Sequence, residues 1–247
     1  MCSVALIRLI LIVFYTAVLG SVAIVFSLMV PGGSTFTPLA RIWSRLILGT
    51  CRVRVRVAGA AGVDTARSCV YIANHQSLFD IPALIVALPT GFRMTPKRGL
   101  LYVPIFGWAL WLGGFIFIDR KNRAKAIRSL DRAALQVAHG RPIVIFAEGT
   151  RSPDGNLLPF KKGGFILALK AGVPVVPVSI LGGREVLPKG SLRIRPGTIA
   201  VTLGAPIGTG DYTLETKDDL IERTRSSITA GLVRQSAAAE SRPLGAG

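Results

Sequence analysis

The sequence is poor in cysteine, histidine and acidic residues, and the shortage of cysteine excludes two kinds of site. Only three of its 247 residues are cysteines and two are histidines. The cysteines, Cys2, Cys51 and Cys69, show no CxxC spacing. They therefore cannot form a complete disulfide framework or a thiolate zinc site. We expect small buried thiols in a reducing compartment.

Acidic residues number 13 against 30 lysines and arginines, which gives a net charge of +17. Half of the residues are nonetheless hydrophobic, and the mean hydropathy is +0.51. Nucleic-acid-binding proteins are basic but seldom this apolar, and the aromatic residues here are mostly Phe within apolar runs. The composition therefore favours an anionic membrane surface as partner and speaks against nucleic acid.

Charge is absent from a long N-terminal segment. Residues 9–30 are almost continuously apolar, enough for about 30 Å of helix. A cleaved signal peptide has a shorter apolar region of about 7–15 residues, so we predict a retained membrane segment. One arginine precedes it, and five follow before the first acidic residue, Asp64. This bias predicts that the rest of the chain lies on the cytoplasmic face, and we expect the inner membrane of a bacterial cell.

A second apolar segment follows a Pro-Gly-Gly break at 31–33. Residues 37–50 place apolar side chains at helical spacing, with Arg41 and Arg45 at separate positions. This pattern is typical of an interfacial helix whose arginines lie among lipid head groups. The break predicts either a single membrane helix followed by this one or a re-entrant helical hairpin. A hairpin buried in a soluble core is the alternative interpretation.

From about residue 51, short β-rich runs alternate with helical stretches. We predict strands at 52–57, 69–73, 91–95, 115–119, 143–147, 175–180 and 198–203. We predict helices at 81–88, 103–112, 123–138, 164–171 and 214–232. The alternation is typical of an α/β domain with a mixed, largely parallel sheet flanked by helices. We thus expect a membrane-anchoring segment over 1–50, the α/β domain over 51–233 and a disordered tail over 234–247.

Two ionisable residues flank a predicted strand-to-helix turn, in the segment NHQSLFD at 74–80. In a sheet covered by helices, ligands usually bind beyond the carboxyl ends of the strands. The turn can bring the Asp80 carboxylate to one imidazole nitrogen of His75 and leave the other nitrogen free to take a proton. That arrangement is typical of a general base with an orienting acid. The alternative is that Asp80 caps the following helix and His75 is incidental.

Two further strand ends carry arginine. The segment FAEGTRS at 146–152 contains Glu148 and Arg151, and the segment GGFIFIDR at 113–120 ends with Arg120. An arginine can hold a phosphate through two parallel hydrogen bonds, and Glu148 can orient Arg151. A single arginine is usually a solvated surface charge, but several at neighbouring strand ends favour an anion site.

Four blocks together resemble the 1-acyl-sn-glycerol-3-phosphate acyltransferases, also called lysophosphatidate acyltransferases. These are NHQSLFD, GGFIFIDR, FAEGTRS and VPVVPVSI at 173–180, in the family's order. With the N-terminal segment, the resemblance spans most of 5–205. It implies that His75 is the catalytic base and Asp80 its partner. It also implies that the phosphate of the acyl acceptor is bound by Lys97, Arg120, Glu148, Gly149, Thr150 and Arg151.

The implied reaction transfers a fatty acyl group from acyl-CoA or acyl-carrier protein to the sn-2 hydroxyl of lysophosphatidate, giving phosphatidic acid. The thioester is already activated, so we expect no cofactor and no metal; GxSxG, P-loop, HExxH and GxGxxG motifs are absent. Gly99 departs from the acidic or polar residue of many members, which leaves another lysolipid open as acceptor. A non-catalytic lipid-binding protein would not need the His75–Asp80 pair, and a thioesterase would not need a glycerophosphate pocket.

Overall fold

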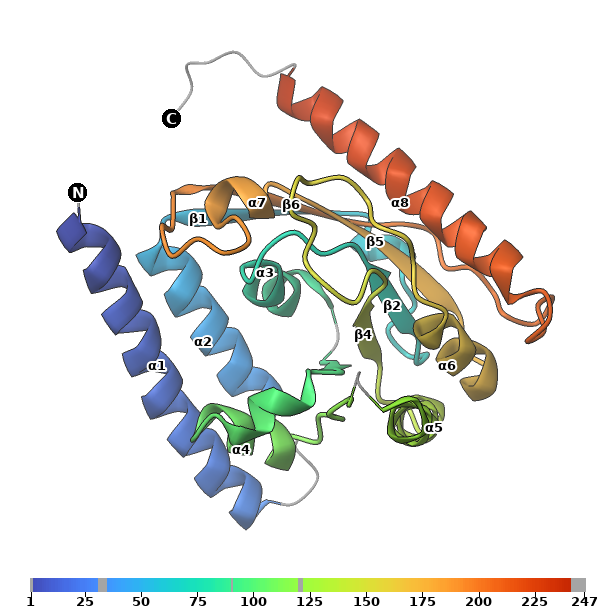
Figure 1. Cartoon of the computed structure of the whole chain (residues 1–247), viewed down its shortest axis with the longest axis horizontal. Helices are drawn as coiled ribbons and strands as arrows, with labels where there is room; N and C mark the ends of the chain where they lie inside the picture. Colours follow the sequence, from blue (N-terminus) through green and yellow to red (C-terminus); the bar gives the residue numbers. More distant parts are fainter. Residues whose placement is uncertain (1, 31–34, 90, 120–121, 241–247) are drawn as a thin grey trace.

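The structure, a computed structural model, describes residues 2–30, 35–89, 91–119 and 122–240. A six-stranded sheet lies at the centre of these residues, and helices cover both of its faces (Figure 1). The strands are β1 (Val53–Ala58), β2 (Val70–Ala73), β3 (Arg93–Met94), β4 (Ile143–Phe146), β5 (Val175–Leu181) and β6 (Gly197–Leu203). Their order is β1-β6-β5-β2-β4-β3, and every pair is parallel except β5–β6. The mixed, largely parallel sheet is confirmed.

The helices match most of the predicted segments. They are α1 (Cys2–Met29), α2 (Phe36–Thr50), α3 (Asp80–Ala87), α4 (Phe106–Leu112), α5 (Arg123–Ala138), α6 (Gly163–Ala171), α7 (Gly183–Val186) and α8 (Lys217–Glu240), with short 3₁₀ turns η1 (Ala60–Gly62) and η2 (Arg98–Tyr102). Helix α2 ends at Thr50 and β1 begins at Val53, so the chain passes directly from the paired helices to the sheet.

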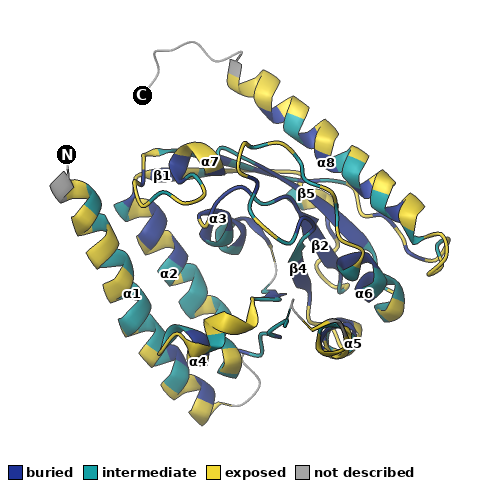
Figure 2. Cartoon of the chain, in the orientation of Figure 1, coloured by how far each residue is buried: buried dark blue, intermediate teal, exposed yellow. Residues whose placement is uncertain are grey.

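The two faces of the sheet bury different side chains. On β2, Tyr71 and Ala73 join the core beneath α2 and α3, whereas Val70 and Ile72 join the core beneath α5, α6 and α8. All four side chains are at most 1% exposed, and Figure 2 shows β2 buried between the two helical layers. A strand covered on both faces has a continuous apolar sequence, which explains why this one alternates so little.

The N-terminal helices α1 and α2 lie side by side along one flank of the molecule (Figure 1). Trp43 Nε1 donates to Thr16 Oγ1 at 3.0 Å, and the hydroxyls of Tyr15 and Thr50 lie 3.3 Å apart. Near the start of α1, Arg8 Nη1 donates to the carbonyl of Ile194 at 3.0 Å. The helix is therefore held to α2 at two points and to the α/β domain at Ile194.

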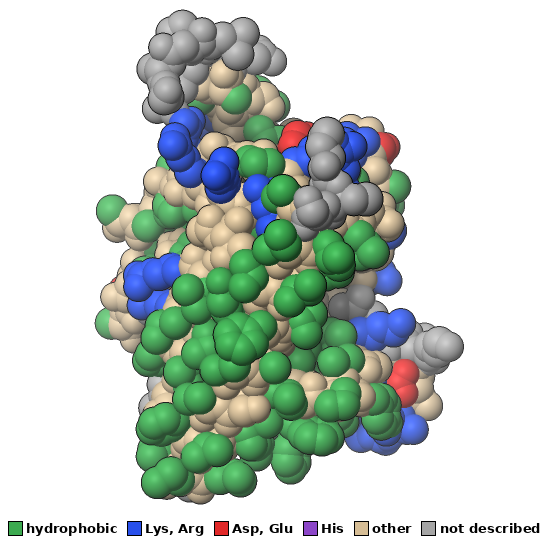
Figure 3. Space-filling view, turned by 90° about the vertical axis from the view of Figure 1, so that its left-hand side faces the viewer, with side chains coloured by type: hydrophobic (Ala, Val, Ile, Leu, Met, Phe, Trp, Pro, Cys, Tyr) green, Lys and Arg blue, Asp and Glu red, His purple; other side chains and the backbone are tan. Residues whose placement is uncertain are grey.

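The outer face of α1 remains apolar and exposed. Figure 3 shows hydrophobic side chains gathered over this flank, with basic side chains around their upper margin. Within the described ranges, residues 4–29 of α1 form the one helix that is long and apolar enough to cross a membrane. The predicted apolar helix is therefore present.

The predicted strand at 115–119 does not form. In the described part of the chain, this run makes one isolated bridge, between Ile118 and Lys97. The sheet ends at β3, which has two residues, so the segment has no edge long enough to extend. Its apolar side chains Phe115 and Ile116 pack into the two cores without a ladder.

Two other expectations are corrected. Arg41 does not extend toward a lipid surface: its Nη2 donates to the carbonyls of Leu88 and Pro89 at 3.1 Å each, where α3 ends and leaves carbonyls unpaired. The tail expected from residue 234 is helical through Glu240. Gln235 there donates to Ser179 O at 3.1 Å, and the following alanines favour helix. Residues 241–247 lie outside the described residues.

Candidate active site

The turn after β2 is fixed by its first side chain. Asn74 is 1% exposed, and its amide bonds both backbone groups of Ile180 on β5. Nδ2 donates to the carbonyl oxygen at 2.8 Å, and Oδ1 accepts from the backbone N–H at 2.7 Å. The side chain thereby extends the hydrogen bonding between β2 and β5 by one position. This pairing fixes the end of β2 and the start of the turn that carries His75.

His75 and Asp80 lie together, as the sequence predicts. Nδ1 of His75 lies 2.8 Å from Oδ2 of Asp80, and the two side chains are 12% and 0% exposed. A carboxylate accepts hydrogen bonds, so Nδ1 carries the hydrogen of a neutral ring and Nε2 keeps its lone pair. Nε2 makes no hydrogen bond to any residue that the structure describes, and His75 lines a large cavity. The free nitrogen is therefore available to a bound hydroxyl.

Asp80 orients the turn and does not cap α3. It is the first residue of that helix, and its Oδ2 also accepts from the backbone N–H groups of Gln76 at 2.7 Å and Ser77 at 2.8 Å. The helix-cap alternative is thus wrong, since these bonds lead back toward His75. Oδ1 is buried without a partner among the described residues, and a Cβ on Gly183 would overlap it. Gly183 therefore leaves the space that Asp80 occupies.

Glu148 joins the His75 turn to the turn that follows β4. It is 2% exposed; Oε1 accepts from the backbone N–H of His75 at 3.0 Å, and Oε2 accepts from that of Leu158 at 3.2 Å. Burial raises the pKa of Glu148, while these two backbone hydrogen bonds oppose the rise. In the described structure neither oxygen bonds Arg151, so the expectation that Glu148 orients Arg151 is corrected. Glu148 positions the backbone of His75.

The imidazole ring is also held by stacking. Phe146, the last residue of β4, lies parallel to His75 with the ring centroids 3.7 Å apart and the planes inclined by 11°. The backbone N–H of Ser152 donates to the carbonyl of His75 at 2.8 Å. The FAEGTRS segment thus supports the NHQSLFD turn through three of its residues, a contact that neither segment reveals alone.

Thr150 and Arg151, two of the predicted phosphate-binding residues, lie in the turn that follows β4. Thr150 is exposed and Arg151 half-buried, and the guanidinium of Arg151 has no ion pair or hydrogen bond to the described residues. Lys189, between α7 and β6, crosses the same turn: its Nζ donates to Arg151 O at 2.9 Å and lies 3.4 Å from Thr150 Oγ1. Sequence reasoning missed Lys189, because a lone lysine so far along the chain carries no local signal.

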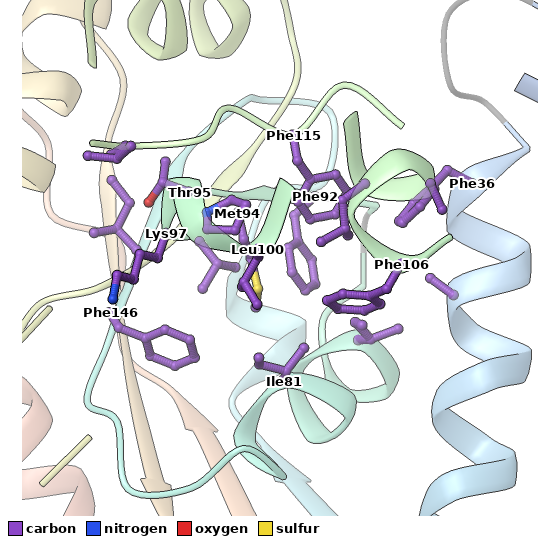
Figure 4. Close-up of a pocket in the computed structure, with 18 of the residues that line it drawn as sticks. Phe36, Ile81, Phe92, Met94, Thr95, Lys97, Leu100, Phe106, Phe115 and Phe146 are labelled. Atoms are coloured by element: carbon purple, nitrogen blue, oxygen red, sulfur yellow. The ribbon is translucent and has the colours of Figure 1, made fainter. Parts of the chain in front are cut away.

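Lys97 and Gly149 line the same cavity as His75. In Figure 4, the Lys97 side chain extends toward Phe146, whose ring stacks on His75. Gly149 has a φ of 68°, in the left-handed region that favours glycine. Arg120 lies outside the described residues, so its role in binding phosphate stays a prediction.

The cavity has a volume of about 500 Å³ and connects the His75 turn to the N-terminal helices. Such a volume is ordinary for a small-molecule site. Its walls are mainly aromatic and aliphatic, as Figure 4 shows for Phe36, Ile81, Phe92, Met94, Phe106 and Phe115. Helix α1 closes it with Thr16, Leu19, Gly20 and Ala23. A hydrocarbon chain is the ligand that this lining suits.

Comparison with known proteins agrees with this geometry. Residues 54–181 match the family model described as Acyltransferase. A 1-acyl-sn-glycerol-3-phosphate acyltransferase of Limnanthes douglasii is 33% identical over 201 residues, which are 81% of this chain and 69% of that protein. The chain belongs to the 1-acyl-sn-glycerol-3-phosphate acyltransferase family. Another relative, the alpha acyltransferase of Homo sapiens, is 34% identical over 177 residues, 71% of this chain and 62% of the human protein.

The acyltransferase fold is shared over the whole chain. The crystal structure of the 1-acyl-sn-glycerophosphate acyltransferase PlsC from Thermotoga maritima matches with a TM-score of 0.81 at 26% identity, covering 99% of this chain and 98% of that one. Some plant and algal members are longer. The chain spans 40% of the chloroplastic relative from Brassica napus, with 39% identity over 140 residues, and 48% of the relative from Chlamydomonas reinhardtii.

Proposed function

We propose that the protein is a 1-acylglycerol-3-phosphate O-acyltransferase. It transfers a fatty acyl group from acyl-CoA or acyl-carrier protein to the free sn-2 hydroxyl of 1-acyl-glycerol-3-phosphate and so forms phosphatidic acid. The observation that carries the proposal is the free Nε2 of the buried His75–Asp80 pair at an apolar cavity. The family of the chain supports it, since its relatives bear the name of this activity.

The proposed reaction needs one proton acceptor and no external energy source. Nε2 of His75 takes the proton of the acceptor hydroxyl while that oxygen bonds to the thioester carbonyl carbon. The carbon–sulfur bond then breaks, and the leaving sulfur receives the proton from the imidazolium, giving a free thiol and the new ester. Asp80 stabilises the imidazolium between the two steps. A positioned base of this kind contributes about 10²–10⁴-fold to the rate.

Membrane attachment is the second part of the proposal. Helix α1 has an exposed apolar outer face, and its inner residues Thr16, Leu19, Gly20 and Ala23 line the cavity. A lipid substrate can therefore keep its acyl chain in apolar surroundings as it moves from bilayer to site. The arginines that follow α1 favour the cytoplasmic face for the α/β domain.

A product assay tests the proposal directly. Purified protein receives acyl-CoA or acyl-carrier protein together with a panel of lysolipids, and the products are identified by mass. We expect phosphatidic acid from 1-acyl-glycerol-3-phosphate. Free fatty acid without a new ester would identify a thioesterase instead, and binding of lysolipid without any turnover would identify a lipid-binding protein.

Arg151 allows acceptor binding to be separated from chemistry. Its guanidinium has no partner among the described residues, so it is free to hold a phosphate through two parallel hydrogen bonds. We expect Arg151→Ala to lower kcat/KM for the phosphate-bearing acceptor by roughly tenfold to a few hundredfold. The KM for the acyl donor should change much less. Equal losses toward a monoacylglycerol acceptor would show that Arg151 is structural.

A further inference from the structure

Another cation, which neither motif nor spacing indicates, reaches the cavity beside His75. Lys161 stands just before α6, and its backbone N–H donates to the carbonyl of Ala147 at 2.7 Å. This bond brings residue 161 alongside the end of β4. Its side chain lines the same cavity as His75 and Lys97.

The side chain of Lys161 runs across the backbone of Gly149. A Cβ on Gly149 would lie 2.9 Å from Cδ, 3.0 Å from Cε and 3.3 Å from Nζ of Lys161. The ammonium group is therefore next to the residue that joins Glu148 to Thr150. A side chain at position 149 would displace it. The glycine serves two purposes here: it permits the left-handed turn, and it leaves room for the lysine.

The Lys161 ammonium has no carboxylate partner among the residues that the structure describes, unlike the lysines near it. Lys162 Nζ lies 3.1 Å from Asp218, and Lys170 Nζ lies 2.6 Å from Asp131. The nearby Glu148 carboxylate accepts from two backbone N–H groups. An ammonium that is not neutralised, beside a cavity with a second lysine in its wall, attracts an anion.

Resting on the proposed function, we propose that Lys161 binds the phosphate of the acyl acceptor. A phosphate monoester carries nearly two negative charges at neutral pH, whereas a phosphodiester carries one. Lys161, Lys97 and Arg151 supply three positive charges around the turn after β4 and the cavity. The geometry thus makes the site selective for lysolipids that end in a phosphomonoester over those with a phosphodiester head group.

The neighbouring lysine provides a matched control. We compare Lys161→Met with Lys162→Met in the full chain, using 1-acyl-glycerol-3-phosphate as the probe. Its Kd is measured by calorimetry in detergent, and acceptor and donor KM values are measured separately. Lys161→Met should raise the acceptor Kd and KM roughly tenfold, as expected for loss of one charge-assisted hydrogen bond. The donor KM should stay within about twofold, and Lys161→Arg should recover most of the affinity, because a guanidinium also forms charge-assisted hydrogen bonds to phosphate.

Lys162→Met should leave the acceptor Kd near the wild-type value, since it removes only an exposed ion pair. Selectivity gives a second readout: the preference for 1-acyl-glycerol-3-phosphate over 1-acyl-glycerophosphoglycerol should fall in Lys161→Met alone. If Lys161→Met binds 1-acyl-glycerol-3-phosphate as tightly as Lys162→Met does, and the wild type transfers acyl groups, the role of Lys161 is overturned and the proposed function stands. Weaker binding in Lys161→Met alone, without transfer by the wild type, would support the phosphate site and overturn the function.

Discussion

His75 is the residue on which the proposed chemistry depends most. We expect His75→Ala to abolish acyl transfer while the protein stays folded and bound to membranes, because the side chain stacks at a cavity wall and carries no backbone contact that alanine would remove. Asp80→Asn should lose less activity, through weaker stabilisation of the imidazolium. Steady-state kcat, circular dichroism and vesicle sedimentation measure these effects. A kcat above about a tenth of wild type in His75→Ala would contradict the assignment.

Glu148 should make stability depend on pH in an unusual direction. Its ordinary pKa is 4.5, and burial raises that pKa in the folded protein. Between these two pKa values the folded state binds more protons than the unfolded state, so stability rises as the pH falls through this window. This contribution is complete below pH 4.5 and is lost as the pH rises through the folded pKa.

Glu148→Gln isolates this effect, since glutamine does not titrate. Urea unfolding of both proteins in detergent, at several pH values, should show the wild type gaining stability relative to the variant as the pH falls from neutral toward 4.5. A constant difference between the two proteins over that range would show that Glu148 does not titrate there.

At the scale of single residues, local contacts were predictable and distant ones were not. The His75–Asp80 pair lies within one turn, so its spacing in the sequence limits its geometry. The Glu148–His75 bond joins residues 73 positions apart, and Lys189 meets Arg151 across 38 positions. Such contacts depend on strand order, which β2, β4 and β5 determine together. The sequence predicts Glu148 at the site, but Arg151 is the wrong partner for its carboxylate, which bonds the backbone of His75 and Leu158 instead.

Helix α1 has two surfaces that can be tested separately. Ile10 and Val13 are 56% and 61% exposed on its outer face, and neither lines the cavity. We expect Ile10→Ser/Val13→Ser to weaken membrane attachment and to leave transfer in detergent unchanged. Deletion of residues 1–35 should release much of the protein from membranes and should also lower activity, because α1 closes the cavity.

Fractionation at high salt and a detergent assay of kcat distinguish these outcomes. Residual attachment of the truncated protein should be sensitive to salt, since it depends on the arginines between residues 45 and 56. If the truncated protein stays bound at high salt without detergent, α2 is the main anchor. If it keeps full activity, α1 does not form the functional wall of the cavity.

At the scale of elements, strong periodicity was the most reliable signal. The prediction of a helix at 123–138 coincides with α5, whose N-terminus is capped by Asn122 Oδ1 accepting from Lys125 at 3.0 Å. The apolar run at 115–119 has strand composition but no strand, because composition reports burial and not the presence of a pairing edge. The last helix was predicted to end too early, since its final turns are exposed except at positions such as Gln235 and show no apolar face.

The charge of the whole molecule should govern how fast it captures anionic substrates. A net charge of +17 draws an anionic donor such as acyl-CoA toward the protein. We expect kcat/KM for acyl-CoA to fall several-fold as salt rises, because the Debye length shrinks from about 30 Å at 0.01 M to about 3 Å at 1 M. An uncharged thioester of the same chain length is the control, and an equal fall for both would contradict electrostatic capture.

The pairing of β1 with β6 has a consequence for how the protein is made. Residues 53–58 leave the ribosome long before residues 197–203, the only strand that they pair with in the described sheet. The hydrogen bond from Arg8 to the carbonyl of Ile194 likewise forms only after residue 194 has been synthesised. During synthesis the apolar helix therefore emerges first, and its bond to Ile194 forms only after most of the chain has been made. A bilayer that accepts this helix early would keep its apolar side chains out of water until β6 completes the sheet. The membrane that we propose as the site of action would thus also stabilise the nascent chain.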